Sequence, residues 1–175
     1  MTQDMLLPTS VDVLRCVERT LETVIAPTLT GTEPRSAAAT MGHLIRHVVL
    51  RIEHEGQMLF DDIGVLRPLL MQVESYLKGR PADDGEAARV REGIAAVLAR
   101  PPSSTGYRDV ASLAAEVSAL RQSVCDALAF VQAQKPDGTG PAAAVHEALK
   151  RYIAWEIEQE SQLIDPAFEG FGPRR

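Results

Sequence analysis

Apolar residues recur every three or four positions along most of the chain, and clusters of Gly and Pro divide the pattern into segments. This spacing is typical of amphipathic helices. The first predicted helix follows a hydroxyl N-cap at residues 9–10, with Asp12 in its first turn, and ends near Pro27. Its apolar stripe consists of Val11, Leu14, Val17, Leu21, Val24 and Ile25.

Residues 35–63 predict a long second helix, for which Gly64 is a plausible end. Pro68 then fits the first turn of a shorter helix at 66–77. Further predicted helices cover residues 86–99, 109–135 and 142–164, and the tail from Pro166 is expected to be loosely attached. At 175 residues the chain fits one all-helical domain, residues 1–168, with 169–175 as a loosely ordered tail.

A segment of this pattern occurs twice, because residues 44–57 align with residues 149–162 at an offset of 105, with six of fourteen positions identical. Each copy of the repeat falls in the second helix of a predicted helical hairpin, so the two helices are expected to occupy equivalent positions in the fold. We therefore predict an all-α bundle of about six helices, in which two hairpins with pseudo-twofold symmetry are joined by a helical crossover. An up-and-down bundle and a six-helix array are the alternatives.

The repeat also marks candidate binding residues. They share one helix face in each copy and are Arg46, Glu53, Gln57, Arg151, Glu158 and Gln162. If the helices cross antiparallel, Arg46 comes level with Glu158 and Arg151 with Glu53. The favoured interpretation is a structural ion network that fixes helix register. The alternative is a polar pocket that receives an anion between the two arginines.

Three of the four histidines, His43, His47 and His54, fall in one sector of the second predicted helix. His43 and His47 have the i, i+4 spacing that can hold a metal ion through two ring nitrogens. No Glu-x-x-His or His-Glu-x-x-His motif occurs in the sequence, and four histidines are too few for a hemerythrin-like centre. Interface or core-edge histidines are therefore favoured, and no cofactor is predicted.

Composition narrows the class of protein. A net charge of −6, a pI near 5.2 and dispersed arginines give no basic patch for nucleic acid. No apolar run approaches the roughly 20 residues that span a bilayer, and no leader-like pattern opens the chain, so a soluble cytoplasmic protein without a membrane partner is expected. Cys16 and Cys125 are predicted to be buried reduced thiols, and Asp61 and Asp62 to lie at a solvated helix end.

Three short patterns carry a family resemblance. They are residues 8–14, residues 25–29 before a loop, and the helix end at residues 51–56. With them, residues 7–29 and 36–70 resemble an uncharacterised bacterial family of small helical proteins, often encoded beside aminoglycoside-phosphotransferase-like kinases and acyl-CoA dehydrogenases. The resemblance implies an accessory role and supplies no catalytic residues.

Nucleophile-elbow, phosphate-loop and dinucleotide-binding motifs do not occur in the sequence. We therefore expect a non-catalytic accessory or interaction protein with a protein partner, most simply a homo-oligomer formed through an exposed apolar helix face. Tyr152, Trp155 and Ile157 suggest such a face. The alternative is a bundle that binds a metal ion or a small anion.

Overall fold

The computed structural model describes residues 7–81, 83–100, 108–134 and 138–168, and these residues are mostly helical and contain no strand. The all-α prediction is confirmed. The predicted count of about six helices is wrong for the described residues, because one long helix replaces two predicted ones. The five α-helices are α1 (Ser10–Thr20), α2 (Thr32–Lys78), α3 (Gly85–Leu98), α4 (Val110–Ala133) and α5 (Gly140–Phe168).

The chain divides into two compact units. The first unit comprises Met1–Glu55 with Gln159–Arg175, and the second comprises Gly56–Glu158. The prediction of a single domain at residues 1–168 concerns how these units join and stays a prediction, and the predicted tail at 169–175 lies outside the described residues. No helix in the described parts of the chain has the length and apolar character needed to cross a bilayer.

The predicted N-cap of α1 is present. The Thr9 hydroxyl accepts a hydrogen bond from the Asp12 amide, and the Asp12 carboxylate accepts one from the Thr9 amide, which together form a capping box. After Thr20 the backbone continues as a π-helical turn, Leu21–Ile25, and a 3-10 turn, Ala26–Thr28. Gly31 then adopts a φ of 93°, a value that favours glycine, and precedes α2 directly.

Helix α2 runs through both Gly64 and Pro68, so the predicted break between two helices is wrong. Proline inside a helix costs about 3 kcal/mol, because it removes one hydrogen bond and crowds the carbonyl four residues earlier. In α2 that carbonyl belongs to Gly64. Leu66, Leu69 and Leu70 are all buried around the proline. Each contributes about 1.5–3 kcal/mol of burial, which offsets the cost.

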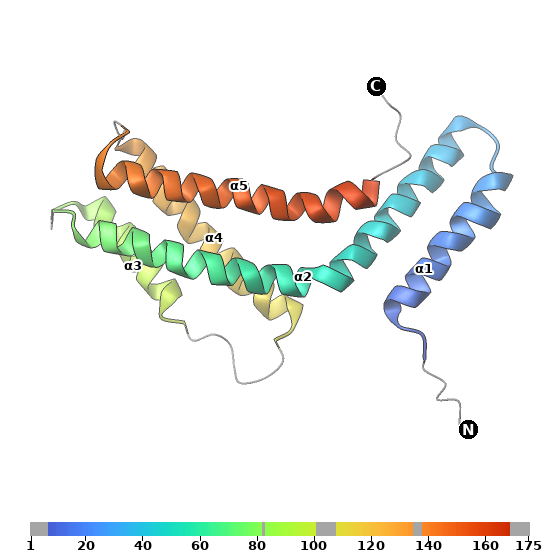
Figure 1. Ribbon diagram of the computed structural model, residues 1–175, viewed down its shortest axis with the longest axis horizontal. Helices are drawn as coiled ribbons and strands as arrows, with labels where there is room; N and C mark the ends of the chain where they lie inside the picture. The colour runs from blue at the N-terminus through green and yellow to red at the C-terminus, as the bar shows by residue number, and fades with distance from the viewer. Residues whose placement is uncertain (1–6, 82, 101–107, 135–137, 169–175) are drawn as a thin grey trace. The chain divides into compact units, whose positions relative to one another are not determined.

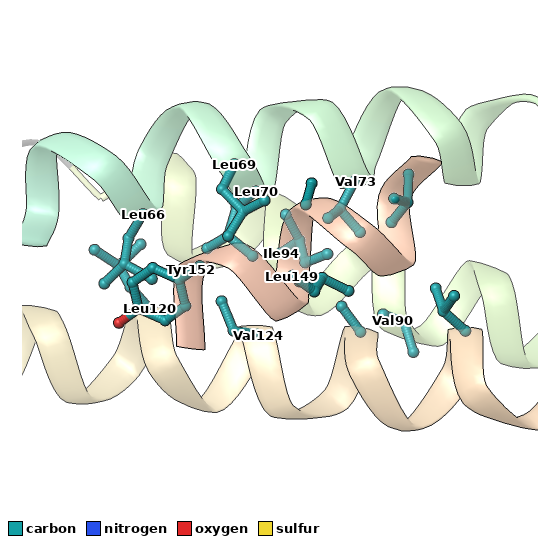
Figure 2. Close-up of a cluster of buried hydrophobic side chains, with 14 of the residues drawn as sticks. Leu66, Leu69, Leu70, Val73, Val90, Ile94, Leu120, Val124, Leu149 and Tyr152 are labelled. Atoms are coloured by element: carbon teal, nitrogen blue, oxygen red, sulfur yellow. The ribbon is translucent and has the colours of Figure 1, made fainter. Parts of the chain in front are cut away.

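The second unit is built around one apolar core, to which α3, α4 and the parts of α2 and α5 within this unit all contribute. Figure 2 shows this cluster, with Leu66 and Leu70 on α2, Ile94 on α3, Leu120 on α4 and Leu149 on α5. These five side chains are at most 1% exposed. The core of this unit is therefore filled with closely packed aliphatic side chains.

The three later helices are close to their predicted bounds. Asp84 caps α3 through the Ala87 amide, and Asp109 caps α4 through the Ser112 amide. Helix α5 extends past Pro166 to Phe168, so the expectation of a loose segment from Pro166 is wrong for its first three residues. Burial of Ala167 explains this extension, since the residue is fully covered.

Candidate functional site

Ion pairs join α1 to the N-terminal half of α2 in the first unit, where the two helices run antiparallel as a hairpin (Figure 1). Arg46 Nε lies 2.6 Å from a Glu18 carboxylate oxygen, and Arg46 Nη2 lies 3.4 Å from Glu22. Arg15 of α1 pairs with Glu53 of α2 at 2.8 Å. Two of the repeat's charged residues therefore hold partners on α1, which sequence reasoning did not anticipate.

The remaining members of the repeat lie on exposed parts of two helices. Gln57 on α2 donates a hydrogen bond to Asp61 at 2.8 Å, and Arg151, Glu158 and Gln162 lie on α5 with exposed side chains. The predicted pairs Arg46–Glu158 and Arg151–Glu53 would each join residues of different units. These pairs stay predictions.

His43 and Arg46 hold the C-terminal turn of α5 in the first unit. His43 Nδ1 lies 3.0 Å from the carbonyl oxygen of Ala167, and Arg46 Nη1 donates to the same oxygen at 3.3 Å. The His43 ring stacks on Phe168 with centroids 5.3 Å apart. Basic side chains at a helix C-terminus satisfy carbonyls that lack helical partners. This arrangement gives both residues a structural role.

His47 accepts a hydrogen bond from Arg51 at its ε nitrogen, at 3.1 Å, while its buried δ nitrogen has no hydrogen-bond partner. Among the described residues, His, Cys, Asp and Glu form no group of three or more that could hold a metal ion. His54 is exposed about two turns further along α2. His43 and His47 thus make helix contacts.

Aliphatic side chains gather on an exposed face of the same hairpin. Seven of them are between 44% and 53% exposed, although such residues usually form a core. We call this set the apolar face: Val13, Val17, Ile25, Met41, Leu44, Val48 and Ile52. At about 100° per residue, the α2 members fall within one sector, away from the sides that carry Arg46 and His43. The hairpin therefore presents an uncovered apolar surface.

A groove of about 450 Å³ lies along this face between α1 and α2. Its lining residues are Pro8, Asp12, Val13, Cys16, Val17, Thr20, Leu21, Ile25, Met41 and Ile45. Cys16 lies in the groove and is exposed. Cys125, on α4, is exposed as well, so the prediction of two buried thiols is wrong. Apart from the buried Leu21, the apolar stripe predicted for the first helix is exposed or half-buried here, because α1 buries none of its own residues.

A polar network in the second unit was missed by sequence reasoning. Asp62 is 3% exposed, which contradicts its expected place at a solvated helix end. It accepts hydrogen bonds from the Tyr152 hydroxyl at 3.0 Å and from Arg121, which also pairs with Glu156 at 2.7 Å. Burial, followed by the neighbouring Asp62 charge, raises the pKa of Tyr152 well above its usual value, so the phenol keeps its proton and donates.

Tyr152 was also expected to belong to an exposed apolar face. It is 4% exposed and belongs to the core, and Trp155 packs partly buried against that core. Ile157 is exposed, as expected. The helical period alone could not separate these three residues, because it does not say which neighbouring helix covers which side.

A second ion cluster in this unit connects α2, α3 and α4. Glu116 on α4 pairs with Arg67 on α2 at 2.8 Å and with Arg108, and Arg67 also donates to the carbonyls of Leu98 and Arg100. Burial raises the pKa of Glu116, but hydrogen bonds from Arg67 and Arg108 outweigh it and lower the pKa overall. The cluster ties the end of α3 to α2 and α4.

The chain was compared with protein-family models, with curated proteins and with solved structures, and none of them matches it.

Proposed function

We propose that this protein is a non-catalytic interaction protein that binds a partner through the apolar face of its first unit. The observation that carries the proposal is the contrast between the two units. Leu66, Leu70 and Leu120 fill a core in the second unit, whereas aliphatic residues of the first unit are left about half exposed on one face. Contiguous apolar surface of this kind is typical of protein-binding sites.

The energetics of burial favour a stable complex. A half-exposed aliphatic side chain presents on the order of 80 Å², so the seven residues offer about 550 Å². Burying this area contributes about 14 kcal/mol at 25 cal/mol per Å². Association costs about 4–15 kcal/mol in lost translational and rotational freedom. The face is therefore large enough to supply most of the affinity of a specific complex.

The charged residues beside the face support a binding role over a catalytic one. Arg46 is engaged by Glu18 and Glu22, and Arg15 by Glu53. These pairs fix the two helices in register and leave the face between them apolar. An accessory role, which the family resemblance also implies, is part of the same proposal.

The pseudo-twofold pairing of two hairpins is a further part of the proposal. Its support is that both copies of the repeat lie in long helices, α2 and α5, at the positions that the sequence predicts. Charge reversal tests it, because Arg46→Glu is rescued by Glu158→Arg if the two residues pair across the repeat. Rescue by Glu18→Arg alone would assign Arg46 to α1 and contradict the pairing.

The metal- or anion-binding alternative has less support. A hollow of about 390 Å³ beside the hairpin is lined by Arg35 and Arg46, but Arg46 faces two carboxylates there and Arg35 donates to the carbonyl of Leu29. Elemental analysis of the purified protein, with His47→Ala as control, tests metal binding. Stoichiometric metal that is lost in His47→Ala would favour this alternative over the interaction role.

The interaction role is tested with immobilised protein and soluble extract of the source cells. Three forms are compared: the natural chain, Val48→Asp on the apolar face, and Ile157→Asp, which places the same charge at an exposed position 65% accessible on α5. A partner retained by the natural chain and by Ile157→Asp, but lost with Val48→Asp, is the expected result. Equal retention by all three forms would contradict the assignment of the face.

A further inference from the structure

We infer that the occupant of the apolar face is a second copy of this chain, so that two α1–α2 hairpins pack face to face about a twofold axis as a four-helix layer. The inference rests on the proposed function and names the partner for the same surface. Three properties of the face support it: its charge, its shape and its area.

The face is compatible with itself in charge. A twofold interface brings one surface patch against an identical patch, so a like charge near the axis would meet its own copy and repel it. The seven residues of the apolar face carry no charge. Asp12 lines the groove, where its carboxylate accepts hydrogen bonds from Thr9, and the neighbouring Arg51 and Glu55 of α2 pair with each other. The seven apolar members therefore bring no charge of their own into a self-association interface.

The face offers both a groove and a ridge. The groove lies between α1 and α2, and beside it Leu44, Val48 and Ile52 form a ridge at intervals of four residues along α2. A twofold axis carries the ridge of each copy into the groove of the other, so that one rotation makes two equal contacts. The groove of 450 Å³ equals the volume of about 15 water molecules, which is room for several aliphatic side chains.

The area agrees with that of a stable dimer. A standard interface buries about 800 Å² on each partner, and about 65% of a homodimer interface is apolar, which corresponds to roughly 500 Å² per partner. The apolar face offers about 550 Å² by the estimate above. Pairing two hairpins also gives α1 and α2 the additional helix neighbours that helices of a four-helix bundle have.

Light scattering after size exclusion, over a dilution series, measures the mass of the full chain. The natural chain and Ile157→Asp are expected at twice 19.0 kDa, and Val48→Asp at 19.0 kDa. A buried unpaired carboxylate in each copy raises the dissociation constant by about 100-fold or more. Val48 is 44% exposed, so the monomer tolerates the change, and Ile52→Asp repeats the test on the same ridge.

The outcomes separate this inference from the proposed function. A natural chain that stays at 19.0 kDa throughout overturns the inference, whereas the retention experiment still decides whether another partner binds the face. A dimer that persists in both Val48→Asp and Ile52→Asp overturns the inference and the assignment of the face together. A dimer that Ile157→Asp disperses places the interface on α5 and also overturns the inference.

Discussion

Single residues of the second unit show how a polar group is stabilised inside an apolar core. Tyr152 donates its hydroxyl to the buried Asp62 carboxylate. Hydrogen bonds to charged groups contribute about 1.5–3 kcal/mol. We therefore expect Tyr152→Phe to lower the free energy of unfolding by about that amount in chemical denaturation.

Tyr76 provides the matched control, because its hydroxyl is buried and has no hydrogen-bond partner. Removing an unsatisfied buried hydroxyl relieves a desolvation cost, so Tyr76→Phe is expected to leave stability unchanged or raise it. If both substitutions cost the same, the effect at Tyr152 is one of packing and the hydrogen bond to Asp62 contributes nothing measurable.

The Glu116 cluster predicts a pH dependence. The pKa of Glu116 is lower in the folded chain than in the unfolded chain, where it is near 4.5. The contribution of Glu116 to stability is therefore complete above the unfolded pKa and is lost as pH falls through the folded pKa. Glu116→Gln removes this titration. In urea unfolding at a series of acidic pH values, the stability of the natural chain is expected to fall more steeply than that of the variant. Parallel curves would show that Glu116 is not stabilised by Arg67 and Arg108.

Residue-level predictions from the sequence succeeded where the signal was local. Thr9 with Asp12 was readable as a cap, because both partners lie within one turn. The burial of Asp62 was not readable, because its partners Tyr152 and Arg121 come from distant helices. Arg46 was singled out as a binding candidate, but its contacts with Glu18 depend on how α1 lies beside α2.

Among the elements, α2 departs most from its predicted form. Gly64 lies in the interior of this helix, and a Cβ added there would meet nothing within 4 Å. We expect Gly64→Ala to raise the free energy of unfolding by about 0.5–1 kcal/mol, because alanine loses less backbone entropy on folding. Thermal or urea unfolding measures the change.

Gly31 gives the opposite control, since its φ of 93° is strained for any residue with a side chain. Gly31→Ala is expected to destabilise by about 1 kcal/mol. If Gly64→Ala also destabilises, the helix breaks at Gly64 in solution. This result would contradict a continuous α2 and favour the two separate helices that the sequence predicts.

Most helix boundaries could be read from the sequence, because caps and loops are local features. Asp84 and Asp109 mark the starts of α3 and α4 as expected. Gly64 and Pro68 misled the prediction because propensity favours a break there, while burial of Leu66 and Leu70 on one continuous helix outweighs it.

At the scale of the whole molecule, the all-α class follows from composition and helical period, and the structure confirms it. The sequence could not show that the chain divides into two units, since the apolar stripes of both look alike. It marked an apolar stripe that includes Val17 on the first helix, but periodicity does not say what covers such a stripe. In the structure that side is open, and the interaction role follows from this difference.

Self-association through the apolar face can be measured at the two cysteines, because Cys16 lies in the groove and Cys125 lies on α4 of the second unit. The measurement is the rate at which a thiol reagent modifies Cys16 relative to Cys125 in the natural chain, as protein concentration increases. If a second copy covers the apolar face, Cys16 becomes protected while Cys125 stays reactive, and Val48→Asp abolishes the protection. A ratio that is independent of protein concentration would contradict self-association through this face.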